Sequence, residues 1–233
     1  MAAQHKLIQL DQIKFENVSF QVAGLDPVLK SVDLDMPMDQ TVIVQSTDPA
    51  HAVHFLELLA GRKQPQTGQV HWCDAHGSED EINSAPFHEV VSGYFESLRP
   101  HPETPVSLIF ANTGSTAEVI QHAIEHFGLN NILSKKFRTL TYADQKLCLL
   151  IAATLRTPQM LVLEDPAVGL KESQFLNFLD WVQYWQRQGQ FRHIFMTNHH
   201  PTAARHFDHL TLLIDEGLVY VEDETTIKKA FHF

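Results

Sequence analysis

The sequence has only two cysteines, Cys73 and Cys148, in 233 residues. Two cysteines form no disulfide framework and no paired ligand set for zinc, which is typical of proteins from a reducing compartment. Long apolar runs are also missing, because the longest one, Leu147 to Leu155, is too short to cross a bilayer. The amino terminus does not have the charged-then-apolar layout of a signal peptide. We therefore expect a cytoplasmic protein without a metal site.

Positive charge is scarce as well. The chain has 17 lysines and arginines against 28 acidic residues, a formal net charge of -11. Such a balance argues against a surface built to bind the phosphate backbone of DNA or RNA, so we expect no nucleic-acid partner. The 44% of hydrophobic residues suffices for a full core in a single domain.

The periodicity of apolar residues predicts an α/β fold. Strands are expected in the first hundred residues at Ile13–Phe20, Val28–Met36, Thr41–Gln45, Gln69–Cys73 and Val90–Phe95. One helix interrupts them after Asp48 and ends at Gly61. Residues 104–157 have helical periodicity, including a buried helix over 147–155. Strands at Met160–Leu163, His193–Met196, Leu210–Ile214 and Leu218–Val221, with a helix over Phe175–Trp185, then predict a parallel sheet covered by helices.

Glycine is absent between residues 40 and 60, where a phosphate-binding loop would need it. Such a loop is read as G-x-x-x-x-G-K-[ST] between a buried strand and a helix. Its four defining positions are here Ser46, His51, Ala52 and Val53. A methyl group thus replaces the cation, and Asp48 places a carboxylate where a phosphate would lie. We expect this loop to bind no triphosphate.

Two interpretations of this loop remain open. The first is an ordinary turn from strand to helix, in which Asp48 caps the helix and puts an internal carboxylate at its amino terminus. The second is a loop that binds phosphate through other residues. We favour the first, because Pro49 also removes a backbone N–H donor.

Several motifs follow one another at regular intervals. They are Phe15-Glu-Asn-Val-Ser-Phe20, Pro27-Val-Leu-Lys-Ser-Val-Asp-Leu34, Gly61 to Gly68, Leu140-Thr-Tyr-Ala-Asp-Gln145, Leu161-Val-Leu-Glu-Asp-Pro166 and Gly169-Leu170. In order and spacing, the chain resembles the nucleotide-binding domain of ATP-binding-cassette (ABC) proteins over nearly its whole length. The resemblance implies a P-loop NTPase-like fold with a RecA-like core sheet, an N-terminal antiparallel β subdomain and an inserted helical lobe. Residues 1–233 would form one domain, with a core lobe over 1–97 and 157–233 and a helical lobe over 98–156.

The resemblance also assigns positions to the family's functional motifs. Its signature loop corresponds to Leu140, Thr141, Tyr142, Ala143 and Asp144, where bulky side chains replace two glycines. Its Q-loop glutamine corresponds to Glu96, and the neighbouring surface with Arg99 would contact a permease.

Further departures follow along the chain. The adenine-stacking aromatic is aligned with Val22. The Walker B pair, aspartate and then glutamate in the family, is reversed to Glu164 and Asp165, which shortens the catalytic base by one methylene. Lys171 stands in place of an expected aspartate. The switch histidine corresponds to His199, provided that the following helix is one residue shorter than usual.

Two functions follow from these departures. The first is a catalytically degenerate ABC-type subunit that pairs with another nucleotide-binding domain or a membrane permease, at the inner face of the membrane. No cofactor is expected in it, and ATP and Mg²⁺ would bind only if a partner completes the site. The alternative is a residual or partner-assisted ATPase that uses Glu164, Asp165 and His199. A DNA-repair or chromosome-structuring role ranks last, because the chain is acidic and has no long coiled coil.

Overall fold

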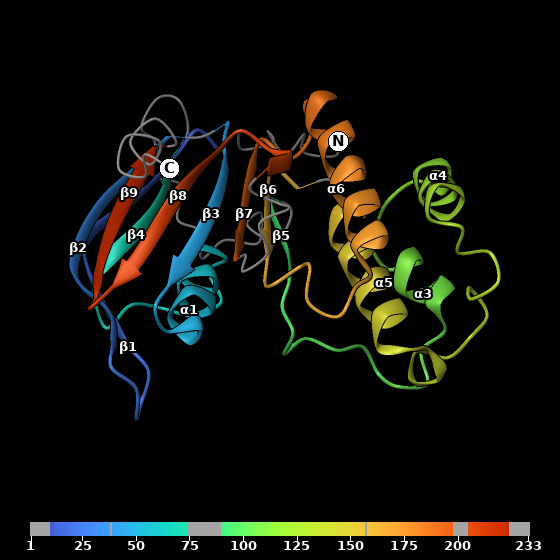
Figure 1. Cartoon of the computed structure of the whole chain (residues 1–233), viewed down its shortest axis with the longest axis horizontal. Helices are drawn as coiled ribbons and strands as arrows, with labels where there is room; N and C mark the ends of the chain where they lie inside the picture. The colour runs from blue at the N-terminus through green and yellow to red at the C-terminus, as the bar shows by residue number, and fades with distance from the viewer. Residues whose placement is uncertain (1–9, 38, 74–89, 157, 198–204, 224–233) are drawn as a thin grey trace, which may run out of the picture.

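The computed structural model describes residues 10–37, 39–73, 90–156, 158–197 and 205–223. They form two sheets and a group of helices (Figure 1). The first sheet is antiparallel and contains β1 (Gln12–Gln21), β2 (Pro27–Pro37) and β4 (Thr67–Cys73) in the order β2-β1-β4. Phe15 lies opposite Leu34 on one side and Val70 on the other. At Gly68 the chain passes so close to β1 that an added Cβ would lie 2.2 Å from the carbonyl oxygen of Asn17.

The second sheet contains six strands in the order β5-β6-β7-β3-β8-β9. These strands are β3 (Thr41–Ser46), β5 (Val91–Tyr94), β6 (Met160–Leu163), β7 (His193–Thr197), β8 (His209–Asp215) and β9 (Leu218–Asp223). All neighbouring strands are parallel except the final pair, β8 and β9, which are antiparallel. Every residue of β6 and β7 is buried, as expected for central strands covered on both faces. The predicted fold class is therefore confirmed.

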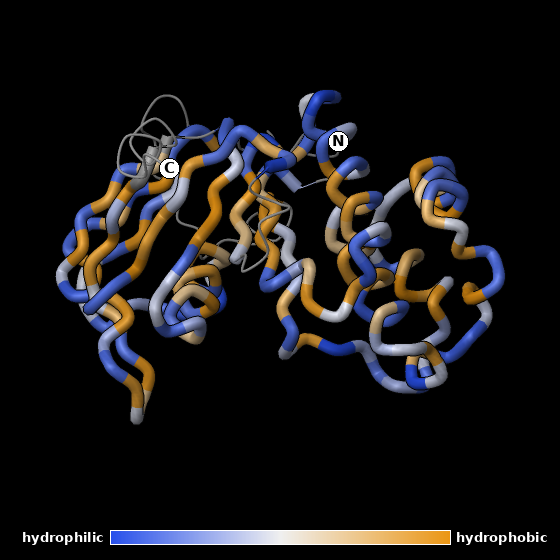
Figure 2. Tube along the Cα trace, in the orientation of Figure 1, coloured by the Kyte–Doolittle hydropathy of each residue, from blue (hydrophilic) through white to orange (hydrophobic). Residues whose placement is uncertain are grey.

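The helices of the described residues pack on this sheet or on one another. They are α1 (Pro49–Leu59), α3 (Val106–Ala111), α4 (Ala117–Phe127), α5 (Tyr142–Leu155) and α6 (Glu172–Arg187), with a short 3₁₀ helix at Phe137–Thr139. Val42 and Val44 of β3 share one core with α1 and the antiparallel sheet, whereas Ile43 points into a second core with α5 and α6. In β3 both orientations thus lead into an apolar core. Orange and blue alternate more clearly along the antiparallel strands at the left of Figure 2.

Helix α5 is longer than predicted. The apolar run indicated a start at Leu147, but the helix begins at Tyr142, within the signature-like segment. Thr141 is its N-cap, and its hydroxyl accepts a hydrogen bond from the backbone N of Asp144 at 3.2 Å. The carboxylate of Asp144 in turn accepts from this hydroxyl at 2.8 Å. This local pair starts the helix one and a half turns before the apolar pattern becomes visible.

Polar contacts join the starts of β1, β3 and β7. They lie at the end of β3 that is opposite to the start of α1. The imidazole of His193 is 1% exposed at the start of β7. Its Nδ1 accepts a hydrogen bond from the backbone N of Asp39 at 2.7 Å, and its Nε2 lies 3.2 Å from the carbonyl oxygen of Leu10. The neighbouring Arg192 donates to Asp39 at 2.7 and 2.8 Å and to Asp11 at 2.9 Å. These contacts fix the segments that lead into β1 and β3.

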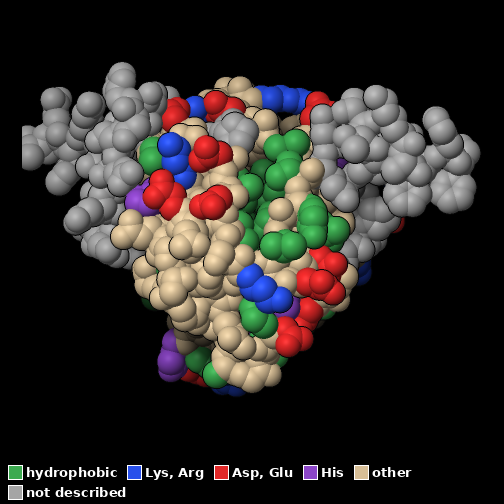
Figure 3. Space-filling model, turned by 90° about the vertical axis from the view of Figure 1, so that its left-hand side faces the viewer, with side chains coloured by type: hydrophobic (Ala, Val, Ile, Leu, Met, Phe, Trp, Pro, Cys, Tyr) green, Lys and Arg blue, Asp and Glu red, His purple; other side chains and the backbone are tan. Residues whose placement is uncertain are grey.

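Figure 3 shows the face at the left of Figure 1, where apolar and acidic side chains are mixed. Leu218, Tyr220 and Val221 of β9 belong to the exposed apolar residues of the chain. The helices α3 to α6 lie at the other side of the molecule (Figure 1). Residues of β9 can therefore serve as controls for substitutions near the helices.

Candidate functional site

The segment that follows β3 has the predicted turn. Asp48 is the N-cap of α1 and its Oδ1 accepts a hydrogen bond from the backbone N of Ala50 at 2.9 Å. The cap predicted from the sequence is thus confirmed. Ser46 is half-buried, and its hydroxyl accepts from the backbone N of Asp48 at 3.3 Å. Because the Asp48 carboxylate already occupies the helix amino terminus, this end of α1 offers an anion less positive potential than an uncapped end.

The side chains at the other three loop positions are not placed to bind phosphate. The side chain of His51 is buried, and its Nε2 lies 3.7 Å from Oδ2 of Asp48 without a hydrogen-bond partner in the described chain. Ala52, at the position of the lysine, is fully buried in the core under α1. Val53 is half-buried. A longer cationic side chain at position 52 would therefore have to leave this core.

The two carboxylates after β6 lie at the same edge of the sheet as the start of α1. The Oε2 atom of Glu164 accepts a hydrogen bond from the backbone N of Glu96 at 2.8 Å. The backbone N of Asp165 donates to the hydroxyl of Thr197 at 2.8 Å, and this hydroxyl donates to Oδ1 of Asp165 at 3.1 Å. Thr197 therefore joins the ends of β6 and β7. His199 lies outside the described residues.

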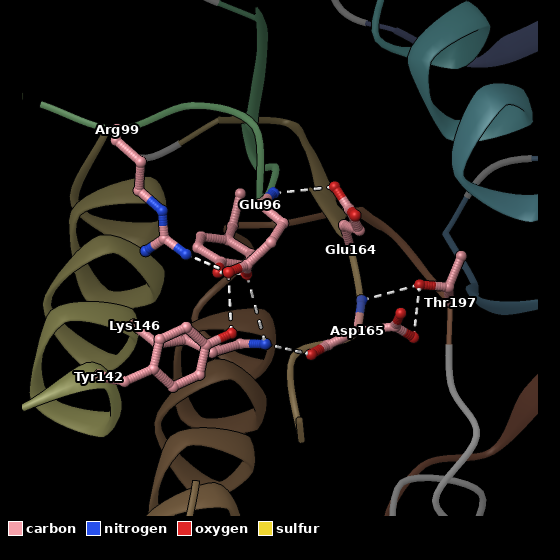
Figure 4. A network of polar contacts seen from close by, with 8 residues as sticks. Glu96, Arg99, Tyr142, Lys146, Glu164, Asp165 and Thr197 are labelled. Atoms are coloured by element: carbon pink, nitrogen blue, oxygen red, sulfur yellow. Dashed lines mark hydrogen bonds and ion pairs between the residues drawn. The ribbon is translucent and has the colours of Figure 1, made fainter. Parts of the chain in front are cut away.

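Glu96 stands at the centre of a second group of side chains, drawn in Figure 4. Its carboxylate accepts hydrogen bonds from the Tyr94 hydroxyl, from the Arg99 guanidinium and, at 2.8 Å, from the Tyr142 hydroxyl. The Nζ atom of Lys146 lies 3.8 Å from Oε2 of Glu96. We call these five residues the Glu96 cluster. It joins the turn after β5 to the first turn of α5.

Lys146 is the most buried charged residue of the cluster, with 1% of its side chain exposed. Its ammonium donates a hydrogen bond of 2.7 Å to the carbonyl oxygen of Asp165. It thus contacts both the Glu96 carboxylate and the backbone at the end of β6 (Figure 4). Burial lowers the pKa of Lys146, whereas the negative charges of Glu96, Asp165 and Glu164 oppose this effect and favour the ammonium.

The acidic groups of the site have different environments. Burial raises the pKa of Glu164, and the charges of Asp165 and Glu96 act in the same direction, although the Glu96 amide stabilises the carboxylate. For Glu96, burial is outweighed by the hydrogen bonds from Tyr94 and Tyr142, with Arg99 and Lys146 nearby, so that its pKa is lowered. Glu96 is therefore the carboxylate that the surrounding residues stabilise most clearly in its charged form.

The signature-like segment does not present its backbone as two glycines would. Leu140 is buried, Thr141 is exposed, and Ala143 and Asp144 are half-buried. The ring of Tyr142 lies over Gly169, where an added Cβ would meet it at 2.2 Å. Lys171 is the N-cap of α6, and its backbone N donates to Oε1 of Gln174 at 3.1 Å.

The structure brings together some of the predicted residues and adds others. Glu96, Arg99, Tyr142, Glu164 and Asp165 share contacts, whereas the segment 46–53 forms its own set around Asp48. The sequence interpretation missed Tyr94, Lys146 and Thr197. A signal existed for Lys146, because it lies four residues before Leu150 and eight before Thr154, on the stripe that α5 buries.

The residues of this site do not fit a divalent cation. Among the described residues, no three histidines, cysteines or acidic side chains form a group that could hold a metal ion. The carboxylate of Glu96 is engaged by hydroxyl, guanidinium and ammonium groups, and that of Glu164 by a backbone amide. The Lys146 ammonium thus already supplies a positive charge beside the Glu96 carboxylate.

A groove lies beside the Glu96 cluster, between the turn after β5 and the helices α3 and α5. It has a volume of about 460 Å³. Its lining includes Leu98, Arg99, His101, Ile109, Leu149 and Arg156. Two members of the Glu96 cluster, Tyr94 and Arg99, therefore also line the groove, whereas Glu96 itself does not.

Solved structures show which fold this is. The chain superposes on an ATP-binding subunit of an ABC transporter with a TM-score of 0.78, at 15% identity and over 96% of this chain and 93% of the other. A dimeric bacterial ABC transporter cassette gives a TM-score of 0.74 at 14% identity, over 91% and 98% of the two chains. The antiparallel sheet, the mixed sheet and its helices thus define the ABC ATPase fold.

Curated proteins support the same family by sequence, although no family model matches the chain. The chain is 26% identical over 223 residues to the thiamine import ATP-binding protein ThiQ of Chelativorans sp. (strain BNC1), over 92% of this chain and 87% of ThiQ. It is 20% identical over 185 residues to the molybdenum import ATP-binding protein ModC of Shewanella sp. (strain MR-4), over 78% of this chain. It spans about half the length of ModC, 51%. These relatives and the fold support its placement among ABC nucleotide-binding domains.

None of the helices in the described part of the chain is both long and apolar enough to cross a membrane.

Proposed function

We propose that this chain is a catalytically degenerate ABC-type subunit, a pseudo-ATPase that acts as a structural or regulatory partner in a membrane transport complex. The observation that carries this proposal is the loop before α1, where the Asp48 carboxylate caps the helix and buried Ala52 stands at the lysine position. Such a loop gives a triphosphate neither a cation nor a free helix terminus. The import ATP-binding proteins among its relatives favour a transport setting.

A thermal-unfolding titration with Mg²⁺ and ATP tests the loss of nucleotide binding. A ligand at a hundred times its dissociation constant adds about 2.7 kcal/mol to the free energy of unfolding, which corresponds to a rise of several degrees in a domain of this size. We expect no rise for this chain, while a relative with an intact phosphate loop serves as the positive control. A clear rise for the isolated chain would show that it binds nucleotide and would contradict the proposal.

The partner is proposed to be a permease, another ABC nucleotide-binding domain, or both, which places the chain at the inner face of the membrane. Its docking surface would be the groove with Leu98 and Arg99, because apolar and basic side chains are exposed there side by side. Leu98→Asp should abolish co-purification of a membrane protein that the unaltered chain retains. Leu218→Asp is the matched control, since Leu98 and Leu218 are 50% and 46% exposed but lie on different faces. Equal recovery with both variants would refute this surface.

The alternative function is a residual or partner-assisted ATPase. The feature that favours it is the pair Glu164 and Asp165 at the end of β6, where burial raises the pKa of Glu164. Phosphate release should then fall in Asp165→Asn and Asp165→Ala variants. The Asn variant is needed as a control, because Asp165 has φ 40° and alanine is strained in that conformation. Equal near-zero release by all three proteins would exclude this alternative for the isolated chain.

A further inference from the structure

The Glu96 cluster joins three segments that are distant in sequence. Glu96 belongs to the turn after β5, Lys146 to the first turns of α5, and Asp165 to the end of β6. The ammonium of Lys146 contacts both other segments at once, at 3.8 Å from the Glu96 carboxylate and 2.7 Å from the Asp165 carbonyl oxygen. A buried cation that is bound in this way fixes the distance between the segments that hold it.

The charges around this ammonium do not cancel, because three carboxylates face two cations. Glu96, Glu164 and Asp165 contribute three carboxylates, and Lys146 and Arg99 face them with two cations. The metal that the fold's family implies does not fit these residues, as described above. Since this charge arrangement differs from the one that the family's metal would need, Lys146 has a role that is not part of the family motifs.

We propose that Lys146 is a built-in cation that holds the turn after β5, the start of α5 and the end of β6 together without nucleotide or metal. The Tyr142 hydroxyl extends this clamp, because it donates to Glu96 from the amino terminus of the same helix. Lys146 is thus a positioning residue for the groove, whose walls are the turn with Arg99 and the helix α5. This role concerns the isolated chain and does not depend on the proposed partner.

A pair of tyrosine variants gives the mildest test. Tyr142→Phe removes one hydrogen bond to Glu96 and keeps the ring that covers Gly169. Tyr184→Phe is the matched control, since the two tyrosines are 45% and 46% exposed and the Tyr184 hydroxyl makes no hydrogen bond within the described residues. We expect amide hydrogen exchange to accelerate in both the Glu96 turn and the first turn of α5 for Tyr142→Phe alone. Unchanged exchange in both segments would overturn the clamp.

Charge variants give the stronger test. Lys146→Met leaves the Glu96 carboxylate without its buried counter-charge and should lower the folding equilibrium constant by about a hundredfold or more, measured by urea unfolding. Glu96→Gln together with Lys146→Met should lose less stability than the sum of the two single losses, because the contact between these two side chains is lost only once. Simple additivity of the two single effects would contradict a coupled pair. If Lys146→Met does not fold, the tyrosine pair still decides.

A third test adds nucleotide and metal to the unaltered chain. Hydrogen exchange of the unaltered chain at the Glu96 turn and the start of α5 should be the same with and without Mg²⁺ and ATP. A gain of protection in both segments on adding them would overturn the proposal, because the clamp would then depend on an external cation. These measurements do not depend on partner binding, which the Leu98→Asp variant tests. The proposed docking surface and the proposed clamp can therefore be refuted independently.

Discussion

Mild acid should weaken the contacts that join the starts of β1, β3 and β7, mainly because His193 becomes protonated. Burial lowers its pKa from 6.5 to about 4, with the positive charge of Arg192 acting in the same direction. In the folded protein the ring is neutral, since Nδ1 accepts from the backbone N of Asp39 and Nε2 faces the Leu10 carbonyl oxygen. A proton on Nδ1 would break the first of these bonds.

The sign and size of the effect follow from these two pKa values. A depressed histidine pKa means that the unfolded chain binds the proton more tightly, so stability is complete above pH 6.5 and falls as the pH decreases towards 4. The loss over this window is about 3 kcal/mol, since each pKa unit corresponds to about 1.4 kcal/mol. This loss is a large share of the free energy of unfolding of a typical folded domain, which is about 5–15 kcal/mol.

Urea unfolding across this pH range measures the effect. His193→Asn keeps an acceptor near the Nδ1 position and does not titrate, so the variant should lose less stability than the unaltered chain between pH 6.5 and 4. His101→Asn is the control for the substitution itself, because His101 is exposed and lies outside these contacts. Taking the difference between the proteins removes the contributions of other groups. Parallel stability curves for the unaltered chain and His193→Asn would refute the reasoning.

Two further predictions concern backbone positions near the site. Gly169→Ala should destabilise the fold by more than Gly189→Ala, because both glycines have φ +80° but only the Cβ at Gly169 would meet the Tyr142 ring. Thermal unfolding of both variants checks this, with about 1 kcal/mol expected for the backbone strain alone. Asp48→Ala removes the cap of α1 and should lower the free energy of unfolding by about 1 kcal/mol. Asp48→Ser keeps a capping side chain and should largely preserve this free energy. Equal stability of the two Asp48 variants in urea would contradict the role of the cap.

Local rules explain why much of the fold could be predicted. The strand Met160–Leu163 was predicted with the same bounds, because a short apolar run between turn residues leaves few alternatives. The cap at Asp48 was also predicted, since it depends on residues that are adjacent in the chain. The start of α5 was predicted five residues too late, because Tyr142 to Lys146 has no apolar periodicity and is fixed by the Thr141 cap.

The candidate site was less accessible from sequence than the fold. The bond between Tyr142 and Glu96 spans 46 residues, and that between Asp165 and Lys146 spans 19. Neither local spacing nor composition encodes such pairs, since tertiary packing alone brings the segments together. Lys146 directly precedes the predicted helix over 147–155, and its burial depends on partners from two other segments. The roles of Glu164, Asp165 and His199 in any reaction stay predictions.

Arg99 belongs at the same time to the groove and to the Glu96 cluster. Its guanidinium lowers the pKa of Glu96, after the larger contributions from Tyr94 and Tyr142. A partner whose acidic group takes this guanidinium for itself would raise the pKa of Glu96, so that docking draws protons from solution. The affinity of such a partner would then increase as the pH falls, and one arginine would make assembly sensitive to acidity.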